Sequence, residues 1–317
     1  MSRSHVPSFT AFAVVALLAV PVARAQPAVD PSPFGVNAHL AGDALLDRLA
    51  DAGVRWLRID IDWSHVERVR GQHDWGDVDR VVGHAERRGL SVFGTIAYTP
   101  AWASGSADHA VPPRDPADYL AFVREVARRY RGRVQALGIW NEPNLREFWK
   151  GSRAQFIQAF LVPGLRVLRA EAPGTLTCGP DLSSSGAWRR DWLDPILRAA
   201  GPLFDVITHH QYDGRDTVGG RLAELDLLRQ FLRLAGHGSK PVWVTEIGWK
   251  VGPRVSLDDQ ARHLRGVYQG MAARPWWTKT FWYDSHGAGW GLLGPDGAPD
   301  AGQPRPAYFA YRDLARG

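Results

Sequence analysis

Two glutamates, each at the end of a short apolar run, are the residues of this chain best placed to do chemistry. Glu142 lies in the segment 138–144, GIWNEPN, and Glu246 lies in the segment 242–249, VWVTEIGW. Both runs are typical of buried parallel strands. Folds of the α/β class place their chemistry where such strands end. Two carboxyl groups at such positions, with no cluster of metal ligands beside them, suggest an acid and a nucleophile that flank one glycosidic bond.

The pattern of the rest of the chain predicts eight strands that alternate with eight helices. Strands are expected at 34–40, 54–63, 90–100, 134–144, 175–183, 204–212, 241–249 and 278–284, and helices near 43–52, 77–89, 116–132, 152–172, 187–200, 220–236, 256–273 and 305–315. This alternation favours an α/β fold, a single (β/α)8 TIM barrel that forms one catalytic domain over residues 34–317. A doubly wound open sheet is the alternative. It predicts a glycine-rich phosphate turn after an early strand, and none is present.

The first 25 residues read as a secretory signal peptide. A basic residue, Arg3, precedes the apolar run 9–22, which ends at the small-residue site Ala23-Arg24-Ala25. A membrane anchor is the alternative, but the run is short for a span. Residues 26–33 are then an N-terminal arm. We expect a secreted protein, periplasmic or extracellular, that has no membrane association after signal cleavage.

Composition narrows the class of partner. The chain is 45% hydrophobic and 22% charged, and its formal net charge of +5 falls to about +3 once the two arginines of residues 1–25 are removed. The remaining arginines are spread over helix faces, which indicates solvated faces rather than a nucleic-acid site. The single cysteine, Cys178, is expected to be a buried core residue.

A barrel gathers the ends of its strands on one rim, so the rim residues can be listed from the sequence. They are acidic, aromatic or amide side chains, with few groups suited to phosphate. In chain order they are Asn37, His39, Arg58, Asp60, Trp63, Tyr98, Trp102, Asn141, Glu142, His210, Tyr212, Glu246, Trp249, Trp282 and Asp284.

The segments 140–144, WNEPN, and 245–249, TEIGW, resemble the large clan of retaining glycosidases that have (β/α)8 barrels and two catalytic glutamates on strands four and seven. Within the clan, the segments 35–37, 209–212 and 281–283 look most like the family 39 β-xylosidase and endo-glycosidase group. The resemblance implies that Glu142 is the general acid/base and Glu246 the nucleophile of a double displacement. The carboxyl groups of such a pair lie about 5–5.5 Å apart.

The same resemblance implies roles for other rim residues. Asn141 matches the asparagine that hydrogen-bonds the sugar 2-hydroxyl, and Arg58 matches the arginine that holds the nucleophile ionised. A structural ion pair of Arg58 with Asp60 or Asp62 is the alternative. Tyr212 is expected to reach the nucleophile, and Trp282 matches the platform tryptophan of the eighth strand.

The remaining candidates concern histidines and tryptophans. His209 and His210 are neighbours on a strand and point to opposite faces, so they cannot both bind one metal ion. His210 is expected to face the cleft and His209 to pack outward. Trp102, Trp249 and Trp290 are candidates for stacking on sugar rings, whose C–H faces are apolar. No metal and no cofactor is expected.

The function that these features predict is a secreted, monomeric O-glycosyl hydrolase that acts on a carbohydrate, a polysaccharide or oligosaccharide. Endo-acting cleavage of a polysaccharide is favoured, because no accessory β-domain follows the eighth helix, whereas many family 39 exo-enzymes carry one. An exo-β-glycosidase on short glycosides and a catalytically idle glycan-binding barrel are the alternatives. The sugar and the linkage stay open. The loops at 103–113 and 286–306 are expected to shape the cleft.

Overall fold

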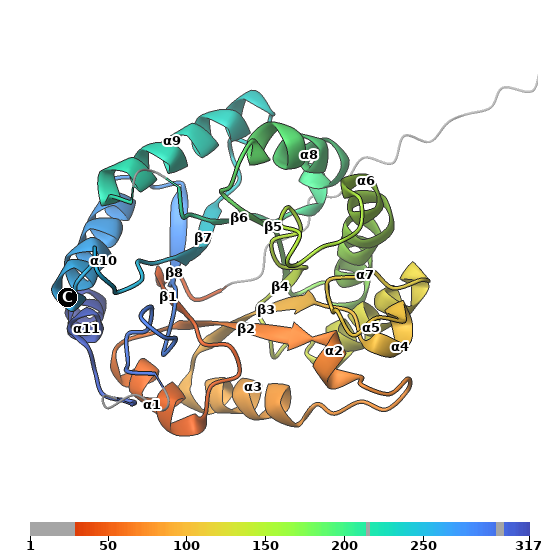
Figure 1. Cartoon of the computed structure of the whole chain (residues 1–317), viewed down its shortest axis with the longest axis horizontal. Coiled ribbons are helices and arrows are strands. Elements are labelled where there is room, and N and C mark those ends of the chain that lie inside the picture. Colours follow the sequence, from red (N-terminus) through yellow and green to blue (C-terminus); the bar gives the residue numbers. More distant parts are fainter. Residues whose placement is uncertain (1–28, 214–215, 296–300) are drawn as a thin grey trace, which may run out of the picture.

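Eight parallel strands close into one barrel in the computed structural model, which describes residues 29–213, 216–295 and 301–317. The strands pair in sequence order, and the last pairs with the first (Figure 1). Their bounds are β1 Phe34–Asn37, β2 Trp56–Asp62, β3 Ser91–Ala97, β4 Ala136–Ile139, β5 Leu176–Ser183, β6 Val206–His210, β7 Val242–Ile247 and β8 Trp277–Trp282. The predicted (β/α)8 barrel and all eight predicted strands are therefore confirmed.

Helices surround the barrel as a ring (Figure 1). The main ones are α1 Asp43–Asp51, α3 Gly76–Arg88, α5 Pro116–Arg129, α7 Val162–Glu171, α8 Asp194–Ala200, α9 Val218–Leu234, α10 Leu257–Ala272 and α11 Pro306–Arg316. Each falls in a stretch that the sequence predicts. Shorter pieces are the helices α2 Trp63–Val66, α4 Ala101–Ser104 and α6 Arg153–Gln155, the π-helical segments η1 Phe156–Leu161 and η2 Arg189–Leu193, and the 3-10 helix η3 Gly201–Leu203. The sequence does not predict α2 and α4, because four residues are too few to show a helical period.

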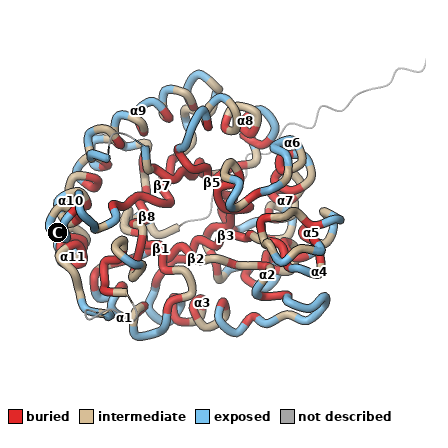
Figure 2. Tube along the Cα trace, in the orientation of Figure 1, coloured by how far each residue is buried: buried red, intermediate tan, exposed pale blue. Residues whose placement is uncertain are grey.

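Alternation along the strands decides which side chains enter the barrel. Side chains that point outward pack against the inner faces of the helices, which are buried while the outer faces are exposed (Figure 2). A separate cluster comes from strand positions alone and fills the interior: Trp56, Phe93, Ala136, Leu176, Cys178, Val206, Trp243 and Phe281. The cluster includes Cys178, as predicted. Because it lies toward the strand starts, the polar interior residues are left at the strand ends.

The described part of the N-terminal arm lies at the end of the barrel where the strands begin. Lys279 Nζ donates to the carbonyl oxygens of Asp30 and Ser32 and lies 4.5 Å from the centre of the Trp56 ring. These contacts tie the arm to the interior cluster. The predicted signal peptide and residues 26–28 lie outside the described residues. No helix in the described ranges is long and apolar enough to cross a membrane.

Candidate active site

The two glutamates of the sequence motifs meet at the rim of the barrel. Glu142 follows β4 and Glu246 lies near the end of β7, and both are buried. A carboxylate oxygen of each and a ring nitrogen of His210 all lie within 4.8 Å of one another. That spacing fits the separation of about 5–5.5 Å in retaining glycosidases and is too short for the 6.5–9.5 Å of inverting ones.

Arg58, on β2, holds Glu246 from inside the barrel. Its Nη1 donates to Glu246 Oε1 at 2.8 Å and to Asn37 Oδ1 at 2.8 Å, and its Nη2 donates to Asn141 Oδ1 at 2.9 Å. Asn37 is itself fixed, because its Nδ2 donates to the Thr245 carbonyl at 2.9 Å. The alternative pairing of Arg58 with Asp60 or Asp62 is not what the structure shows.

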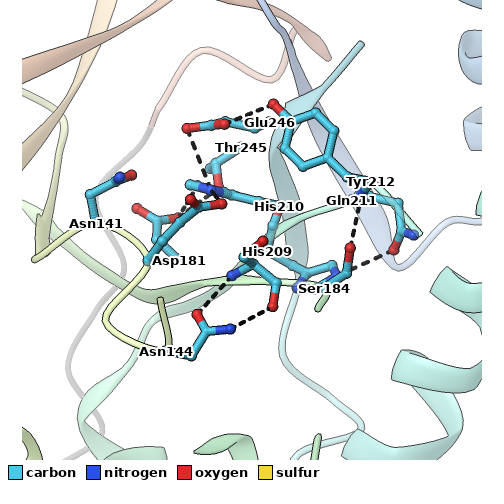
Figure 3. Close-up of polar contacts among 12 residues, drawn as sticks. Asn141, Asn144, Asp181, Ser184, His209, His210, Gln211, Tyr212, Thr245 and Glu246 are labelled. Carbon is cyan, nitrogen blue, oxygen red and sulfur yellow. Dashed lines mark hydrogen bonds and ion pairs between the residues drawn. The ribbon is translucent and has the colours of Figure 1, made fainter. Parts of the chain in front are cut away.

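Tyr212 completes the surroundings of Glu246. Tyr212 follows β6, and its hydroxyl donates to Glu246 Oε2 at 2.8 Å (Figure 3). Burial raises the pKa of Glu246, the charges of His210 and Arg58 lower it, and Glu142 raises it again, so that the pKa of Glu246 lies above its usual value. The hydrogen bonds from Arg58 and Tyr212 are made to the anionic form and oppose the cost of burying it.

His210 contacts both carboxyl groups of the pair. Its Nδ1 is 2.8 Å from Glu142 Oε1 and 3.4 Å from Glu246 Oε1. Burial lowers the pKa of His210, but the charges of Glu246 and Glu142 and the contact with Asp181 outweigh it and raise the pKa to about 10. The anions around His210 therefore favour its protonated, cationic form.

His209 points the other way, as the alternation of a strand requires. Its ring stacks on Trp188 with centroids 4.3 Å apart, and its Nε2 lies 3.2 Å from Gln211 Oε1. Burial, with the neighbouring His210 charge, lowers the pKa of His209 to about 3. The two rings therefore point in opposite directions, as predicted, and His210 contacts the carboxyl pair from behind the cleft lining.

A cleft of about 460 Å³ opens over the carboxyl pair. Its floor and walls combine acidic and aromatic side chains from the ends of all eight strands. His39 stands at one side, where its Nδ1 lies 2.6 Å from Asp60 Oδ2. The lining residues are His39, Arg58, Asp60, Asp62, Tyr98, Asn141, Glu142, Glu147, Phe148, Ser183, Tyr212, Glu246, Tyr283 and Trp290.

Three of the predicted sugar-stacking tryptophans do not line this cleft. Trp282 is fully buried among the outward-facing residues, and it stacks with Trp249 at a centroid distance of 6.2 Å. Trp249 is buried as well, and its Nε1 donates to the Asp216 carbonyl at 3.0 Å. Trp102 packs edge-on against Trp63 and donates to the Glu67 carbonyl at 2.7 Å. The expected stacking role is wrong for Trp282 and Trp249, because both are buried, whereas Trp102 is half-buried outside this cleft and Trp290 lines it.

Tyr283 takes the position that the sequence assigned to Trp282. Phe281 points into the barrel, so Trp282 points outward and Tyr283 inward. Tyr283 lies edge-on to Trp290, with centroids 5.6 Å apart. The close approach of this segment to β7 requires Gly248, where a Cβ would lie 2.1 Å from the Tyr283 carbonyl oxygen. Alternation counted from Phe281 would have found Tyr283 from the sequence.

Asp181 is the second residue that the sequence did not reveal as part of the site. It lies on β5 within 180–182, PDL, an apolar surrounding for a charge and therefore a signal in itself. It is fully buried, 3.5 Å from Arg58 Nη2, and it accepts from Thr245 Oγ1 at 2.6 Å. Burial would raise the pKa of Asp181, but the charge of Arg58 and contacts with His210 and Thr245 hold it well below its usual range.

Backbone strain is concentrated at the same rim. The non-glycine residues with positive φ include His39 at 50°, Tyr98 at 69°, Trp140 at 70°, Glu142 at 41° and Asp181 at 49°. Side chains other than glycine avoid this region, and such residues gather at functional sites. The surrounding structure holds Glu142 in a backbone conformation that it would not adopt on its own.

Glu142, His210 and Glu246 could each offer one atom to a metal ion. The electrostatics argue against such a site. The guanidinium of Arg58 already contacts Glu246, and His210 is itself a cation that contacts both carboxyl groups. A further cation at this position would be repelled by both. The donor set fits a pair of carboxyl groups that work with protons better than it fits a metal centre.

Comparisons with known proteins bear on this geometry. The glycosyl hydrolase catalytic core profile matches residues 116–301, a segment that includes both glutamates. No curated protein matches the chain. A monomeric β-xylosidase from Caulobacter crescentus CB15 has the same fold, with a TM-score of 0.73 and 17% identity over 92% of this chain and 69% of that one.

Two further solved structures share the fold. A GH39 enzyme from Xanthomonas axonopodis pv. citri matches with a TM-score of 0.72 and 18% identity, over 92% of this chain and 68% of that one. GH5_18 from Streptomyces cattleya in complex with GlcNAc matches with a TM-score of 0.69 and 18% identity, over 92% of this chain and 80% of that one. At these identities the likeness establishes the barrel fold.

Proposed function

The chain belongs to the glycosyl hydrolase catalytic core family, and we propose that it is a retaining β-glycosidase. The observation that carries the proposal is the carboxyl pair, whose nearest oxygens lie within 4.8 Å across the rim. At this spacing one carboxylate reaches the anomeric carbon directly and leaves no room for the water that an inverting enzyme activates. Glu246 is the nucleophile, because Arg58 and Tyr212 both donate to its oxygens.

Glu142 acts as the acid and then as the base. In the first step it protonates the leaving oxygen while Glu246 bonds to the anomeric carbon. In the second step the Glu142 carboxylate takes a proton from water, which displaces Glu246 and releases the sugar. Asn141 lines the cleft beside Glu142 and is held by Arg58, which supports its contact with the sugar 2-hydroxyl.

The charge of the cleft supports a neutral glycan as substrate. Besides the catalytic pair, Asp60, Asp62 and Glu147 line it. The two lining residues that can carry positive charge already have partners, since Arg58 contacts Glu246 and His39 contacts Asp60. An anionic sugar such as a uronic acid would meet carboxylates there, and among the described residues no lining cation is left unpaired. We therefore favour uncharged β-glycans, with aromatic faces at Tyr98, Phe148 and Trp290 beneath the sugar rings.

Endo action is the favoured mode. The lining extends from His39 and Asp60, at the ends of β1 and β2, to Ser183, at the end of β5, on the opposite side of the barrel. A chain bound across this width would have units on both sides of the scissile bond. Exo action predicts release of a monosaccharide only. The first products from a reduced oligosaccharide of five or six units decide between the two.

The test is product release from a panel of β-glycans and aryl β-glycosides, with a Glu246→Ala variant beside the wild type. Loss of activity in the variant, with partial rescue by azide and an α-glycosyl azide as product, would establish the nucleophile and retention together. A Glu142→Ala variant should keep its first step on aryl glycosides with good leaving groups, since these need no proton. An inverted anomeric product from the wild type, followed by NMR, would overturn the proposal.

We also propose that residues 1–25 direct export and are then removed. The support is the order of a basic start, an apolar run and a small-residue site in the sequence. Amino-terminal sequencing of the protein recovered outside the cytoplasm of a bacterial host checks this, with Gln26 as the expected first residue. An intact N-terminus that stays with the membrane would point to an anchor instead.

A further inference from the structure

A buried group of alternating charges extends from Glu246, one of the two catalytic carboxyl groups, into the barrel. Asp181 comes from β5, His210 from β6, Arg58 from β2 and Glu246 from β7. His210 and Asp181 lie side by side (Figure 3), with His210 Nε2 3.6 Å from Asp181 Oδ1. The Nδ1 of His210 faces Glu142 Oε1. The imidazole is therefore flanked by Asp181 below and by the catalytic carboxyl groups above. Of these four residues Arg58 and Glu246 line the cleft, whereas Asp181 and His210 lie behind its lining.

Asp181 lies within ion-pair distance of both cations of the site, Arg58 and His210, but forms a hydrogen bond with neither. Its Oδ2 lies 3.5 Å from Arg58 Nη2, and among the described residues Asp181 Oδ2, His210 Nε2 and Arg58 Nε have no hydrogen-bond partner. Its Oδ1 accepts from Thr245 Oγ1. Asp181 therefore interacts with the two cations through its charge. Because the site is buried, solvent screens this interaction only weakly.

The Asp181 carboxylate balances the charge of the buried group. With Glu246 and Asp181 ionised and Glu142 protonated, the two anions balance the two cations Arg58 and His210. Without Asp181 the same group would carry a net positive charge in a buried place, and the imidazolium is the cation that can lose its proton. The other titratable groups that face His210 are Glu142 and Glu246, whereas the ring of the adjacent His209 points away and the pKa of His209 is lowered by burial.

We propose that Asp181 is a positioning residue that keeps His210 in the imidazolium form between the two catalytic carboxyl groups. The inference rests on the proposed function for what that cation does. As an imidazolium, His210 donates from Nδ1 to Glu142 Oε1 and stabilises the carboxylate that Glu142 becomes once it has protonated the leaving oxygen. A neutral imidazole with a free Nδ1 would instead accept the proton that the leaving group needs.

The test measures the protonation state of His210 directly, by NMR of protein with isotope-labelled histidine. The signal is assigned by its loss in His210→Gln. In the wild type the imidazolium should persist at pH 8 and above. In Asp181→Asn its titration midpoint should fall by about two pH units or more, and kcat/KM at pH 7 should fall by about tenfold or more.

Two variants separate charge from structure. Asp205→Asn removes the same charge near the start of β6, where Asp205 accepts from the Thr177 backbone, and should leave both the His210 midpoint and the activity unchanged. Thr245→Val removes the hydrogen bond to Asp181 but keeps its charge, so the midpoint should move much less than in Asp181→Asn. Asp181→Glu restores the carboxylate and should recover part of the shift.

A neutral His210 at pH 7 in the wild type overturns the inference, and this result stands even when Asp181→Asn does not fold. An unshifted midpoint in a folded Asp181→Asn overturns it as well. The titration needs no substrate, so its outcome is separate from that of the proposed function. A protein inactive on every glycan, but with the expected shift, would count against the glycosidase proposal alone.

Discussion

His209 and His210 are adjacent on β6, yet their rings lie on opposite sides of the barrel wall. His209 stacks on Trp188 outside the barrel, and His210 contacts Glu142 inside it. Burial lowers the pKa of His209 to about 3, whereas the anions around His210 raise its pKa to about 10. One of the two is a buried neutral ring and the other a buried cation, and the difference comes from their partners alone.

The opposite pKa shifts of His209 and His210 predict that the folded protein is most stable near neutral pH. The raised pKa of His210 contributes stability that is fully present below its unfolded pKa of about 6.5 and is lost as pH rises toward 10. The lowered pKa of His209 has the opposite effect, because the neutral ring must take up a proton as the chain unfolds in acid. Its contribution is present above about pH 6.5 and is lost as pH falls toward 3.

Urea unfolding between pH 4 and pH 10 checks this prediction. The free energy of unfolding should fall on both sides of a maximum near pH 6–7. His209→Gln should flatten the acid side and leave the alkaline side in place. A wild-type stability that keeps rising to pH 10 would contradict the assignment of His210 as a buried cation.

The alternation of side chains that separates these histidines also explains which parts of the site the sequence predicts correctly and which it does not. The barrel, its eight strands and the meeting of Glu142 with Glu246 follow from apolar runs and from motifs at their ends. Trp282 was assigned from the motif, and a shift of one residue along the strand places it outside and Tyr283 inside. The apolar segment 180–182 marks Asp181 as an unusual buried charge, but its partners Arg58 and His210 come from distant strands, so no local pattern places it in the site.

Arg58 should be needed for folding as well as for activity. Arg58→Met leaves Glu246 and Asp181 buried with one cation fewer, and we expect a loss of about 3–5 kcal/mol in the free energy of unfolding. Arg55→Met is the matched control. Arg55 pairs with Asp30 at 3.1 Å but is half exposed, so its loss should be within about 1 kcal/mol. Equal losses in urea unfolding would show that burial of the Arg58 pair has no special weight.

Tyr212→Phe should impair chemistry while leaving the fold intact. It removes the hydroxyl that donates to Glu246 Oε2 at 2.8 Å and little else. A hydrogen bond to a charged group is worth about 1.5–3 kcal/mol, so kcat/KM should fall by about 10- to 100-fold. Tyr308→Phe is the control: it removes a hydroxyl that donates to the Arg48 carbonyl at 3.0 Å, on α11 away from the cleft, and should leave kcat/KM unchanged. Wild-type kinetics in Tyr212→Phe would show that Arg58 alone positions the nucleophile.

Glu147 should set the charge preference of the cleft. It lines the cleft after β4 and is exposed, and no ion pair is recorded for it among the described residues. Glu147→Lys should raise kcat/KM for glycans that contain uronic acids relative to neutral glycans of the same backbone, and added salt should shrink that gain. Asp77→Lys, which makes the same charge change on α3 away from the cleft, should leave the ratio unchanged. The same ratio in Glu147→Lys and wild type would contradict an electrostatic choice of substrate.

Tyr283 and Trp282 are neighbours for which substitution should give opposite results. Tyr283→Ala removes a cleft wall that meets Trp290, so kcat/KM should fall by about tenfold or more while stability changes little. Trp282→Phe removes volume from a fully buried position against Trp249. It should cost about 1–3 kcal/mol of unfolding free energy and leave kcat/KM within about threefold of wild type. Kinetics and urea unfolding on both variants separate the two effects. If Trp282→Phe instead lost activity and kept its stability, Trp282 would be the residue that stacks on the substrate. The side-chain alternation counted from Phe281 would then not hold at the end of β8.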